Sequence, residues 1–475
     1  MESSLPGYKE KFIEYLINEK ALKFGDFTLK SGRSSPYFFN VGDLNDGIAI
    51  SKLGDAFSSA VLEKGAPDIL FGPSYKGIPL SVATSMSLAI KGTNIGFSFD
   101  RKEVKLYGEA TGADLQKTII VGSEIKNNYK IAILEDVFTT GQTKYETISL
   151  LNRLASNLSI IYCLIVFDRQ EVGIDGKSAV SEFVDKTNIP VHSVVSISDT
   201  LKYLKKHQSQ YANQIKRIEN YLRVYGVDEV KQQFKLAPQM IINNERSVVP
   251  ACDVKTLEEF EEIVKQTHDV DGIGAYKLGF ELGLGFGLKE CVQIARKYTN
   301  KPIIYDHQKA ATDIPDTGRN FAQVCKKAGI DSIILFPQAG PETERAWIYH
   351  ALNEDLPVII GGRMTHPAFS VTEGGFITDE GAMEIYKIAA KIGINNFVVP
   401  GNKPDVIKEV KELIEKEGVS PIFHSPGFIA QGGKLSDAAK AAGNKLHGIV
   451  GRGIYTSKDM KSAAVEYTSQ LNTNK

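Results

Sequence analysis

The sequence KPIIYDHQKAATDIPDT, residues 301–317, joins a short apolar run to an unusual density of charge. The run at 302–305 is of the kind that predicts a buried strand. The charged side chains that follow it are those of Asp306, Lys309, Asp313 and Asp316. Charge beside the end of a buried strand is costly unless it is paired or used. Taken alone, the stretch is compatible with either a solvated loop or a functional site, and its surroundings decide between them.

The C-terminal half of the chain repeats this pattern of a short apolar run followed by polar residues. Between the runs lie segments with helical spacing, such as 256–265 and 404–417. Strands that alternate with helices over a region of this length predict a (β/α)8 TIM barrel. The eight runs that we expect to be its strands are 248–253, 275–280, 302–306, 332–337, 357–362, 396–400, 421–427 and 448–453.

Polar residues gather at one end of nearly every expected strand. In a (β/α)8 barrel the chemistry takes place at the carboxyl ends of the strands, which together form the mouth of the barrel. A surface with scattered charges would show no such bias. The residues at these ends are Asp253, Lys277, Asp306, Lys309, Asp313, Thr365, Ser425, Gly451 and Arg452. We therefore expect an active site at the mouth of the barrel.

These pieces resemble the orotidine 5'-phosphate decarboxylase family, in the same order, over about 245–460. The matching motifs are Ala251-Cys-Asp253, Tyr276-Lys277-Leu-Gly279, the stretch from Asp306 to Thr317, Met364-Thr-His-Pro367, Ser425-Pro-Gly427 with Gln431-Gly-Gly433, and Val450-Gly-Arg452. The resemblance implies removal of CO2 from a nucleotide without a metal or organic cofactor. A lysine held between acids stays charged and can donate a proton.

The same resemblance implies roles for individual residues. Lys309 would donate the proton, and Lys277, Asp306 and Asp313 would complete the charged array. The substrate-binding residues would be Asp253 and Thr365 for ribose or pyrimidine, Gln431, Gly451 and Arg452 for phosphate, and Ser425. In this family the last acid of the motif is supplied across a dimer interface, so Asp313 implies a homodimer.

The spacing around Lys309 departs from the family pattern Asp-x-Lys-x-x-Asp, because one extra residue stands on each side of the lysine. On a regular strand Asp306 and Lys309 point to opposite sides. Both reach one substrate only if the strand ends or bulges at 307–308, and we expect that it does. If Lys309 lies outside the barrel mouth, His307 or Lys277 becomes the candidate. The spacing also leaves open another sugar-phosphate reaction, such as that of the related hexulose-phosphate synthases, which use Mg²⁺.

The most specific piece of the N-terminal half is KIAILEDVFTTGQT at 130–143. An apolar strand ends in Glu135 and Asp136, and a turn rich in hydroxyls and glycine then opens a helix near Lys144. Backbone amides and hydroxyls at the N-terminus of a helix bind phosphate. The two acids can bind ribose hydroxyls or position the Mg²⁺ that accompanies a pyrophosphate. The pattern is not a Walker A loop.

Three further stretches have the composition of an anion site. FTLKSGRSSPYFFN at 27–40 contains two cations and a run of aromatic rings. These side chains could bind a flat anionic ring, or the stretch could be a β-hairpin that packs its aromatic rings inward. FGPSYKGIP at 71–79 is a strand followed by a glycine-rich turn with a lysine, which suits a pyrophosphate. RKEVKLYGE at 101–109 is typical either of a loop that closes over an anion or of a solvated charged loop.

Together with FDRQEVG at 167–173, these motifs resemble the orotate phosphoribosyltransferase family over about 8–205. The resemblance implies a type I phosphoribosyltransferase fold, a doubly wound parallel sheet, and Mg²⁺ carried by phosphoribosyl pyrophosphate. The implied contacts are Lys30, Phe38, Phe39 and Arg169 for orotate, Lys76, Arg101, Lys102 and Lys105 for pyrophosphate, and Glu135, Asp136, Thr139, Thr140, Gly141, Gln142 and Thr143 for ribose 5-phosphate. Lys105 is also a catalytic candidate. Tyr107 stands where the family usually has histidine, so no role that needs an imidazole is expected there.

The domains that we predict are 1–206 for the transferase, 207–240 for a helical linker or a cap on the barrel, and 241–475 for the barrel. Residues 207–240 have helical character but are polar, and we expect no apolar stripe wide enough for a core of their own.

Composition narrows the function classes. The net charge is −1, so charge implies no nucleic-acid partner. The cysteines are widely spaced and predict buried thiols in a reducing compartment. We find no apolar run that reads as a signal peptide or a membrane span, so we expect no membrane partner and a cytoplasmic location. A ligand sensor built on the transferase fold would need a DNA-binding module, and the sequence shows no candidate for one.

The two resemblances together imply a bifunctional enzyme of pyrimidine biosynthesis, of the uridine monophosphate synthase type. Its first half would join orotate to phosphoribosyl pyrophosphate, giving orotidine 5'-phosphate and pyrophosphate. Its second half would decarboxylate that product to UMP.

Overall fold

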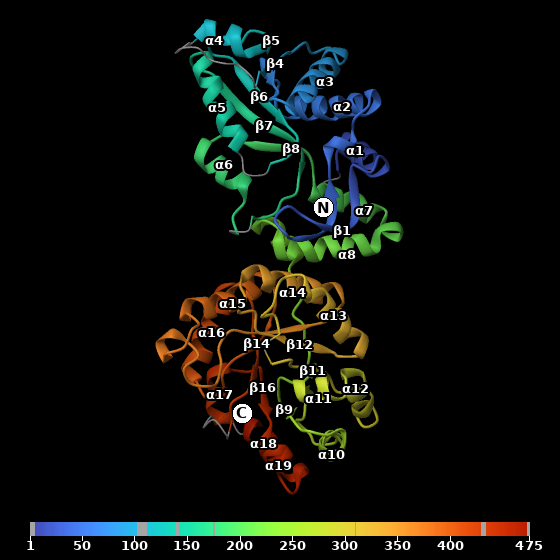
Figure 1. The fold of residues 1–475 in the computed structure, drawn as a ribbon, viewed down its shortest axis with the longest axis vertical. Helices are drawn as coiled ribbons and strands as arrows, with labels where there is room; N and C mark the ends of the chain where they lie inside the picture. The colour runs from blue at the N-terminus through green and yellow to red at the C-terminus, as the bar shows by residue number, and fades with distance from the viewer. Residues whose placement is uncertain are drawn as a thin grey trace. The chain divides into compact units, whose positions relative to one another are not determined.

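The computed structural model describes residues 5–101, 112–138, 142–173, 176–308, 310–428 and 434–472. The chain divides into two compact units, Met1–Val230 and Lys231–Lys475. Figure 1 shows the first unit in blue to green and the second in yellow to red. Within the described residues, no helix is both long and apolar enough to cross a membrane.

A six-stranded sheet forms the centre of the N-terminal unit. Its strands, in spatial order, are β5 (Ile120–Gly122), β4 (Gly96–Asp100), β3 (Ile69–Phe71), β6 (Lys130–Glu135), β7 (Ser159–Asp168) and β8 (Val191–Ser196). Neighbouring strands are parallel, except that β5 runs antiparallel to β4. The predicted α/β fold is confirmed, with one antiparallel edge strand added to the expected parallel sheet.

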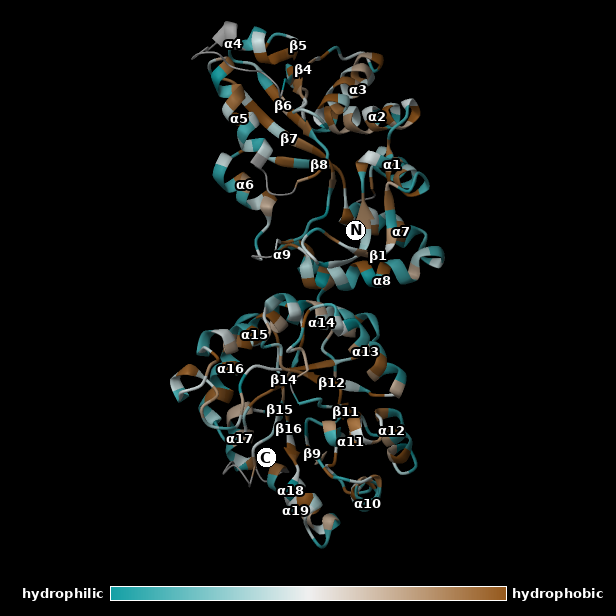
Figure 2. Ribbon diagram, in the orientation of Figure 1, coloured by the Kyte–Doolittle hydropathy of each residue, from teal (hydrophilic) through white to brown (hydrophobic). Residues whose placement is uncertain are grey.

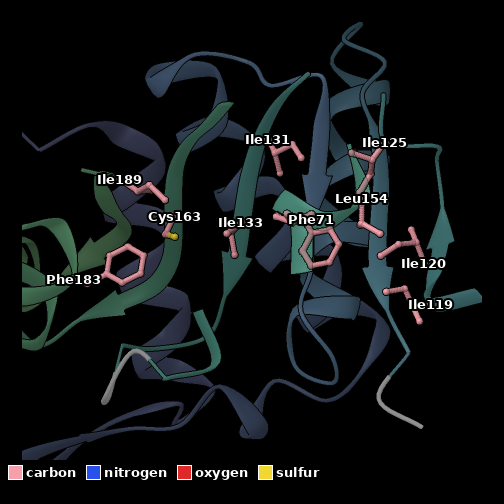
Figure 3. Close-up of a cluster of buried hydrophobic side chains, with 11 residues drawn as sticks. Phe71, Ile119, Ile120, Ile125, Ile131, Ile133, Leu154, Cys163, Phe183 and Ile189 are labelled. Atoms are coloured by element: carbon pink, nitrogen blue, oxygen red, sulfur yellow. The ribbon is translucent and has the colours of Figure 1, made fainter. Parts of the chain in front are cut away.

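Helices lie on both faces of this sheet. The helices of the N-terminal half of the chain are α1 (Gly7–Asn18), α2 (Gly47–Lys64), α3 (Gly77–Ile90), α4 (Gly112–Ile119), α5 (Gln142–Leu154), α6 (Ala179–Thr187), α7 (Ile197–Lys206), α8 (Gln208–Tyr225) and α9 (Asp228–Lys231). Cys163 of β7 packs in a buried cluster with Phe183 of α6 and with Leu154 of α5 (Figure 3). The preceding residue, Tyr162, donates a hydrogen bond to the carbonyl of Gly65 at the end of α2. Successive strand residues point to opposite faces, so α5 and α6 lie on one face and α2 on the other.

An antiparallel hairpin precedes the sheet in sequence and packs against its last-but-one strand. It consists of β1 (Leu22–Thr28) and β2 (Ser34–Phe39). The ring of Phe39 stacks on Phe167 of β7 with 4.8 Å between centroids. The aromatic run of the 27–40 motif therefore packs partly inward, as the hairpin interpretation expects.

Most of the expected linker belongs to the N-terminal unit. α8 turns buried side chains toward that unit, among them Ile215, Ile218, Tyr221, Leu222 and Tyr225. Tyr221 contacts Tyr37 of β2 edge to face, with centroids 5.9 Å apart. The sequence prediction underestimated this face because two of its largest members are tyrosines, whose rings bury while their hydroxyls bond polar neighbours.

The C-terminal unit is a closed barrel of parallel strands, as predicted. Its strands are β9 (Arg246–Cys252), β10 (Tyr276–Leu278), β11 (Ile303–Tyr305), β12 (Ser332–Leu335), β13 (Val358–Gly361), β14 (Asn396–Val398), β15 (Ile422–Ser425) and β16 (Leu446–Val450). Each of the predicted runs contains one of these strands or overlaps it. The register between β16 and β9 closes the circle, pairing Val450 with Pro250.

Helices surround this barrel. They are α10 (Leu257–Thr267), α11 (Phe280–Gly285), α12 (Leu288–Arg296), α13 (Thr317–Ala328), α14 (Pro341–Asn353), α15 (Asp379–Ile392), α16 (Pro404–Lys416), α17 (Leu435–Ala442), α18 (Arg452–Tyr455) and α19 (Met460–Asn472). Figure 2 shows hydrophilic and hydrophobic residues interleaved along them, as expected for helices with one face on a core. The barrel interior is filled by side chains such as Val249, Ile304, Ile334, Ile359 and Val398, so it is a packed core.

Buried polar side chains from four strands contact one another inside the barrel. Nδ1 of His447 lies 2.8 Å from the hydroxyl of Ser247. Nε2 of His424 lies 3.1 Å from the amide oxygen of Asn396, and the two imidazoles are 4.9 Å apart. Burial lowers the pKa of His447 to about 4, and burial together with His447 holds the pKa of His424 well below its ordinary value. Both imidazoles are therefore neutral at pH 7.

Candidate functional site

Three charged side chains from consecutive strands meet at the mouth of the barrel. Nζ of Lys277, in the middle of β10, lies 3.3 Å from Oδ1 of Asp253 and 3.2 Å from Oδ2 of Asp306. Asp253 follows β9 and Asp306 follows β11. The adjacent parallel strands bring their carboxyl ends together, which is why residues far apart in sequence meet here.

The lysine of this array is almost inaccessible, with a side chain that is 5% exposed. Burial by itself lowers its pKa, but the carboxylates of Asp306 and Asp253 outweigh burial, and the pKa of Lys277 is raised above its ordinary value. The ammonium is therefore charged across the physiological range. It forms a fixed positive charge flanked by two acids.

The array lines a cavity of about 290 Å³. Six residues that the sequence predicted for the site lie on its wall: Asp253, Lys277, Asp306, Thr365, Gly451 and Arg452. The polar residues sit among apolar ones such as Ile334, Phe336 and Val398, which belong to the barrel core or pack on it. A concave apolar site with a few convergent polar groups is the usual form of a small-molecule site.

The chain turns sharply after β11, as the altered spacing required. The strand ends at Tyr305, and Gln308 adopts a left-handed conformation with φ 55°. Oδ1 of Asp306 accepts a hydrogen bond from the backbone of Gln308 at 2.9 Å, which closes this turn. Lys309, the expected proton donor, lies outside the described residues.

The two residues that precede Lys309 point in different directions. Gln308 lines the cavity, and its side-chain oxygen accepts a hydrogen bond from the backbone of Phe280 at 3.1 Å. The ring of His307 instead packs against Tyr305 and Phe321, with centroids 5.6 and 6.0 Å apart. Of the two alternatives to Lys309, the structure places Lys277 in the cavity, and His307 is not among the residues that line it.

Two predicted residues do not reach this cavity. Ser425 is fully buried and donates its hydroxyl to the carbonyl of Val399 at 2.9 Å, so it supports the end of β15. Asp313 is exposed, and its carboxylate accepts a hydrogen bond from the adjacent backbone of Ile314 at 2.7 Å. A contribution of Asp313 across a dimer interface stays a prediction. Gln431 lies outside the described residues.

In the N-terminal unit, both acids of the 130–143 motif lie at the carboxyl end of β6. Each pairs with a lysine: Glu135 with Lys144 of α5, and Asp136 with Lys76 of the turn before α3. α5 begins at Gln142, close to where the motif predicts a helix. Thr143 is exposed in its first turn, and Thr139, Thr140 and Gly141 lie outside the described residues.

Arg169 follows β7 and is held by polar and aromatic neighbours. It pairs with Glu171, donates to the hydroxyl of Ser35 at 3.0 Å, and lies over the ring of Tyr37, 4.3 Å from its centroid. Burial alone lowers the pKa of Arg169, but the neighbouring groups raise it well above its usual range. Arg169 and Glu171 also line a second cavity of about 170 Å³ beside Val137.

The remaining predicted residues of this half are dispersed. Lys30 is exposed after β1, Phe38 is half-buried and stacks on Phe27 at 5.6 Å, and Arg101 is exposed after β4. Lys102 and Lys105, and with them the loop that was expected to close over an anion, lie outside the described residues.

Comparison with known proteins gives each half a family. The chain is 39% identical over 221 residues to the orotate phosphoribosyltransferase of Marinobacter nauticus, covering 46% of this chain and 99% of that protein. It is 38% identical over 221 residues to the orotate phosphoribosyltransferase of Methylococcus capsulatus, covering 46% of this chain and 98% of that protein. The chain belongs to the orotate phosphoribosyltransferase family.

The barrel half matches a second family. Residues 246–467 fit the family model "OMPdecase: Orotidine 5'-phosphate decarboxylase / HUMPS family". A solved structure of orotidine 5'-monophosphate decarboxylase from Methanocaldococcus jannaschii is 30% identical, covers 48% of this chain and 99% of that chain, and has a TM-score of 0.43. The orotate phosphoribosyltransferase half is thus fused to a decarboxylase-family barrel, and homology supports both activities.

The decarboxylase cavity also contains residues that the sequence did not single out for a role. They are Gln308, Ile334, Phe336, Arg363, Val398, Phe428 and Tyr455, among others. Gln308 could have been predicted as a site residue, because it belongs to the same turn as Asp306. Phe336 follows β12 and has no polar signal, so only its place at the carboxyl end of a strand could have indicated it.

The transferase acids fit a magnesium ion that arrives with its ligand. Among the residues that the structure describes, no three histidine, cysteine or acidic side chains converge to form a metal cluster. Mg²⁺ bound to phosphates keeps most of its ligands from phosphate oxygens and water, and takes only one or two carboxylates from the protein. Glu135 and Asp136 could supply these carboxylates.

Proposed function

We propose that this chain catalyses two consecutive steps of pyrimidine nucleotide synthesis. The N-terminal half transfers the ribose 5-phosphate of phosphoribosyl pyrophosphate to orotate, and the barrel decarboxylates the resulting orotidine 5'-phosphate to UMP. The observation that supports this most strongly is Lys277 between Asp253 and Asp306, in the cavity of a barrel fused to an orotate phosphoribosyltransferase.

In the transferase step, the bond from ribose C1 to the pyrophosphate oxygen breaks and a bond from C1 to a ring nitrogen of orotate forms, while the proton of that nitrogen is lost to the pyrophosphate or to water. Positive charge develops on the ribose and negative charge leaves on pyrophosphate. Glu135 and Asp136 would bind the ribose hydroxyls, and Lys76 would leave Asp136 for the pyrophosphate, since its side chain is 68% exposed. Mg²⁺, when bound, would neutralise part of the pyrophosphate charge.

Arg169 would bind the carboxylate of orotate in this step. A guanidinium presents paired N–H donors that match a carboxylate. The carboxylate of Glu171 pairs with this guanidinium. Binding of orotate then replaces or shares this contact, so the site is already shaped for a carboxylate.

In the barrel, the bond from C6 of the pyrimidine to its carboxylate breaks, CO2 leaves, and the electron pair stays on C6. The ammonium of Lys277 provides a positive charge next to this carbanion, and the low exposure of the site strengthens the attraction. Lys309 would donate the proton to C6. Arg452 and Gly451 at the end of β16 would hold the phosphate, whose binding energy can be used at the distant carbon.

We further propose that the enzyme works in the cytoplasm as a homodimer, with Mg²⁺ required only for the transferase. Exposed apolar side chains support a subunit contact, since Ile314, next to Asp313, is 60% exposed and Val324 of the following helix α13 is 62% exposed.

The alternative is a barrel that acts on another sugar phosphate with Mg²⁺, because the matching family also includes HUMPS proteins. The two are distinguished by adding orotidine 5'-phosphate directly to the chain, with and without EDTA. The proposed function predicts equal UMP formation in both samples, whereas transfer of phosphoribosyl groups to orotate should stop in EDTA. No UMP from added orotidine 5'-phosphate would contradict the decarboxylase assignment.

A further inference from the structure

The two lysines that pair with the acids at the end of β6 differ in their surroundings. The side chain of Lys76, paired with Asp136, is 68% exposed. The side chain of Lys144, paired with Glu135, is 4% exposed. The first lysine can exchange its acid for a ligand in solution, whereas the second is buried. The two pairs therefore have different roles.

Lys144 contacts the turn that precedes its own helix at several points. Besides pairing with Glu135, its ammonium donates to the carbonyl of Val137 at 3.3 Å and lies 4.7 Å from the ring centroid of Phe138. One side chain thus ties the first turn of α5 to the end of β6 and to the start of the intervening turn. These are the two elements between which the phosphoribosyl group would bind.

Stability alone gives little reason for a lysine here. A buried ammonium loses hydration, and a cation in the first turn of a helix faces the positive end of the helix dipole. Replacing a buried ion pair by apolar side chains is often neutral or stabilising. The ring of Phe138, over which the ammonium lies, packs against a buried apolar cluster that contains Cys163, so an apolar side chain could be accommodated here.

We propose that Lys144 is a positioning residue for the phosphoribosyl group. It holds the carboxylate of Glu135, the carbonyl of Val137 and the ring of Phe138 in the arrangement that binds ribose hydroxyls and the 5-phosphate. This inference rests on the proposed transferase function of the N-terminal half. On this proposal Lys144 affects the binding of phosphoribosyl pyrophosphate, whereas other residues bind orotate.

The test is steady-state kinetics of the full chain carrying Lys144→Met, which keeps the length of the side chain and removes its charge. The KM for phosphoribosyl pyrophosphate should rise about tenfold, while the KM for orotate and kcat change less than about threefold. Lys144→Arg keeps a cation opposite Glu135 and should restore the KM to within about threefold of the unsubstituted chain. A purely structural role would lower the active fraction and hence kcat, without this selective change in KM.

The barrel of the same preparation is the folding control, because decarboxylation of added orotidine 5'-phosphate should be unchanged. Lys126→Met, at an exposed lysine before β6, is the matched control and should leave both activities unchanged. If Lys144→Met does not yield soluble protein, Lys144→Gln replaces it, because the amide keeps a donor for Glu135, and a smaller KM increase is expected.

The outcomes separate the two claims. An active unsubstituted chain whose KM for phosphoribosyl pyrophosphate is unaffected by both Lys144→Met and Lys144→Gln overturns the positioning role alone. A loss confined to kcat, or a defect that Lys144→Arg does not relieve, also overturns it. An unsubstituted chain that fails to consume orotate and phosphoribosyl pyrophosphate overturns the transferase function itself, and this inference with it.

Discussion

Nζ of Lys277 lies 3.2 Å from Oδ2 of Asp306, and the side chains are only 5% and 16% exposed. The second acid, Asp253, is more open, with a side chain that is 33% exposed. The barrel therefore holds a permanent cation at the wall of a small cavity, with one sheltered and one accessible carboxylate beside it. Charges this deeply buried are costly unless they are paired, as these are, or act on a ligand.

Substitution of Lys277 should disable the barrel and spare the other half. Lys277→Met removes the charge that faces the developing carbanion, and decarboxylation should fall by about 10²- to 10³-fold. Product analysis by chromatography should then show orotidine 5'-phosphate accumulating from orotate. Lys289→Met, at an exposed lysine of α12, is the control and should behave as the unsubstituted chain does. Decarboxylation within tenfold of normal in the Lys277 variant would mean that this lysine is not part of the chemistry.

Arg452 should act through the phosphate of the substrate. Arg452→Ala should lower kcat/KM for orotidine 5'-phosphate by about 10- to 100-fold, because remote binding energy is lost at the transition state. The slow reaction of orotidine, which lacks the phosphate, should be the same for the variant and the unsubstituted chain. Equal losses with both substrates would instead place Arg452 at the pyrimidine.

Arg169 should govern the affinity for orotate. Arg169→Lys keeps a positive charge but loses the paired donors of the guanidinium, so the KM for orotate should rise by about tenfold or more. Initial rates at saturating orotate should show little change in the KM for phosphoribosyl pyrophosphate. If both KM values rise together, Arg169 supports the site as a whole through Ser35 and Glu171.

The buried histidines predict a pH dependence of barrel stability. Burial lowers the pKa of His447 from about 6.5 to about 4, so the unfolded chain takes up a proton in this range that the folded barrel excludes. Its contribution to stability is complete above about pH 6.5, declines as the pH falls toward 4, and amounts to about 3 kcal/mol. His424, whose pKa is also lowered by burial and by His447, should add to the decline.

The protein offers a selective probe for this measurement. Its single tryptophan, Trp347, is buried in α14 of the barrel, so urea unfolding followed by tryptophan fluorescence reports on the barrel. The free energy of unfolding should be lower at pH 5 than at pH 7.5. A chain with both His424→Gln and His447→Gln should lose most of this difference. If the difference persists in that variant, carboxylates rather than these imidazoles cause it.

The barrel strands could be predicted because each is a short apolar run bounded by glycine, proline or charge, and such runs repeat. Their ends also showed where the site lies, since parallel strands collect their carboxyl ends at one face. The place of α8 could not be predicted in this way. Its buried face consists partly of tyrosines, and its partners Tyr37 and Glu171 lie far away in sequence.

The individual contacts of the site depend on turn geometry, which a strand pattern does not supply. Asp306 and Gln308 reach the cavity together because the chain turns at Gln308 with a positive φ, while His307 packs outward. Ser425 was expected to bind substrate from its place in a motif, but its hydroxyl is used by the neighbouring strand. The pairing of Glu135 with Lys144 could likewise not be predicted from the sequence, because the lysine lies just beyond the quoted motif.

The most direct measurement follows the carboxylate of orotate through both halves. Orotate labelled in its carboxyl carbon is incubated with the purified chain, phosphoribosyl pyrophosphate and Mg²⁺, and labelled CO2 and UMP are quantified. The fused transferase and decarboxylase predict equal amounts of CO2 and UMP, formed only when phosphoribosyl pyrophosphate is present. Consumption of orotate with orotidine 5'-phosphate as the final product and no labelled CO2 would contradict the assignment of the barrel.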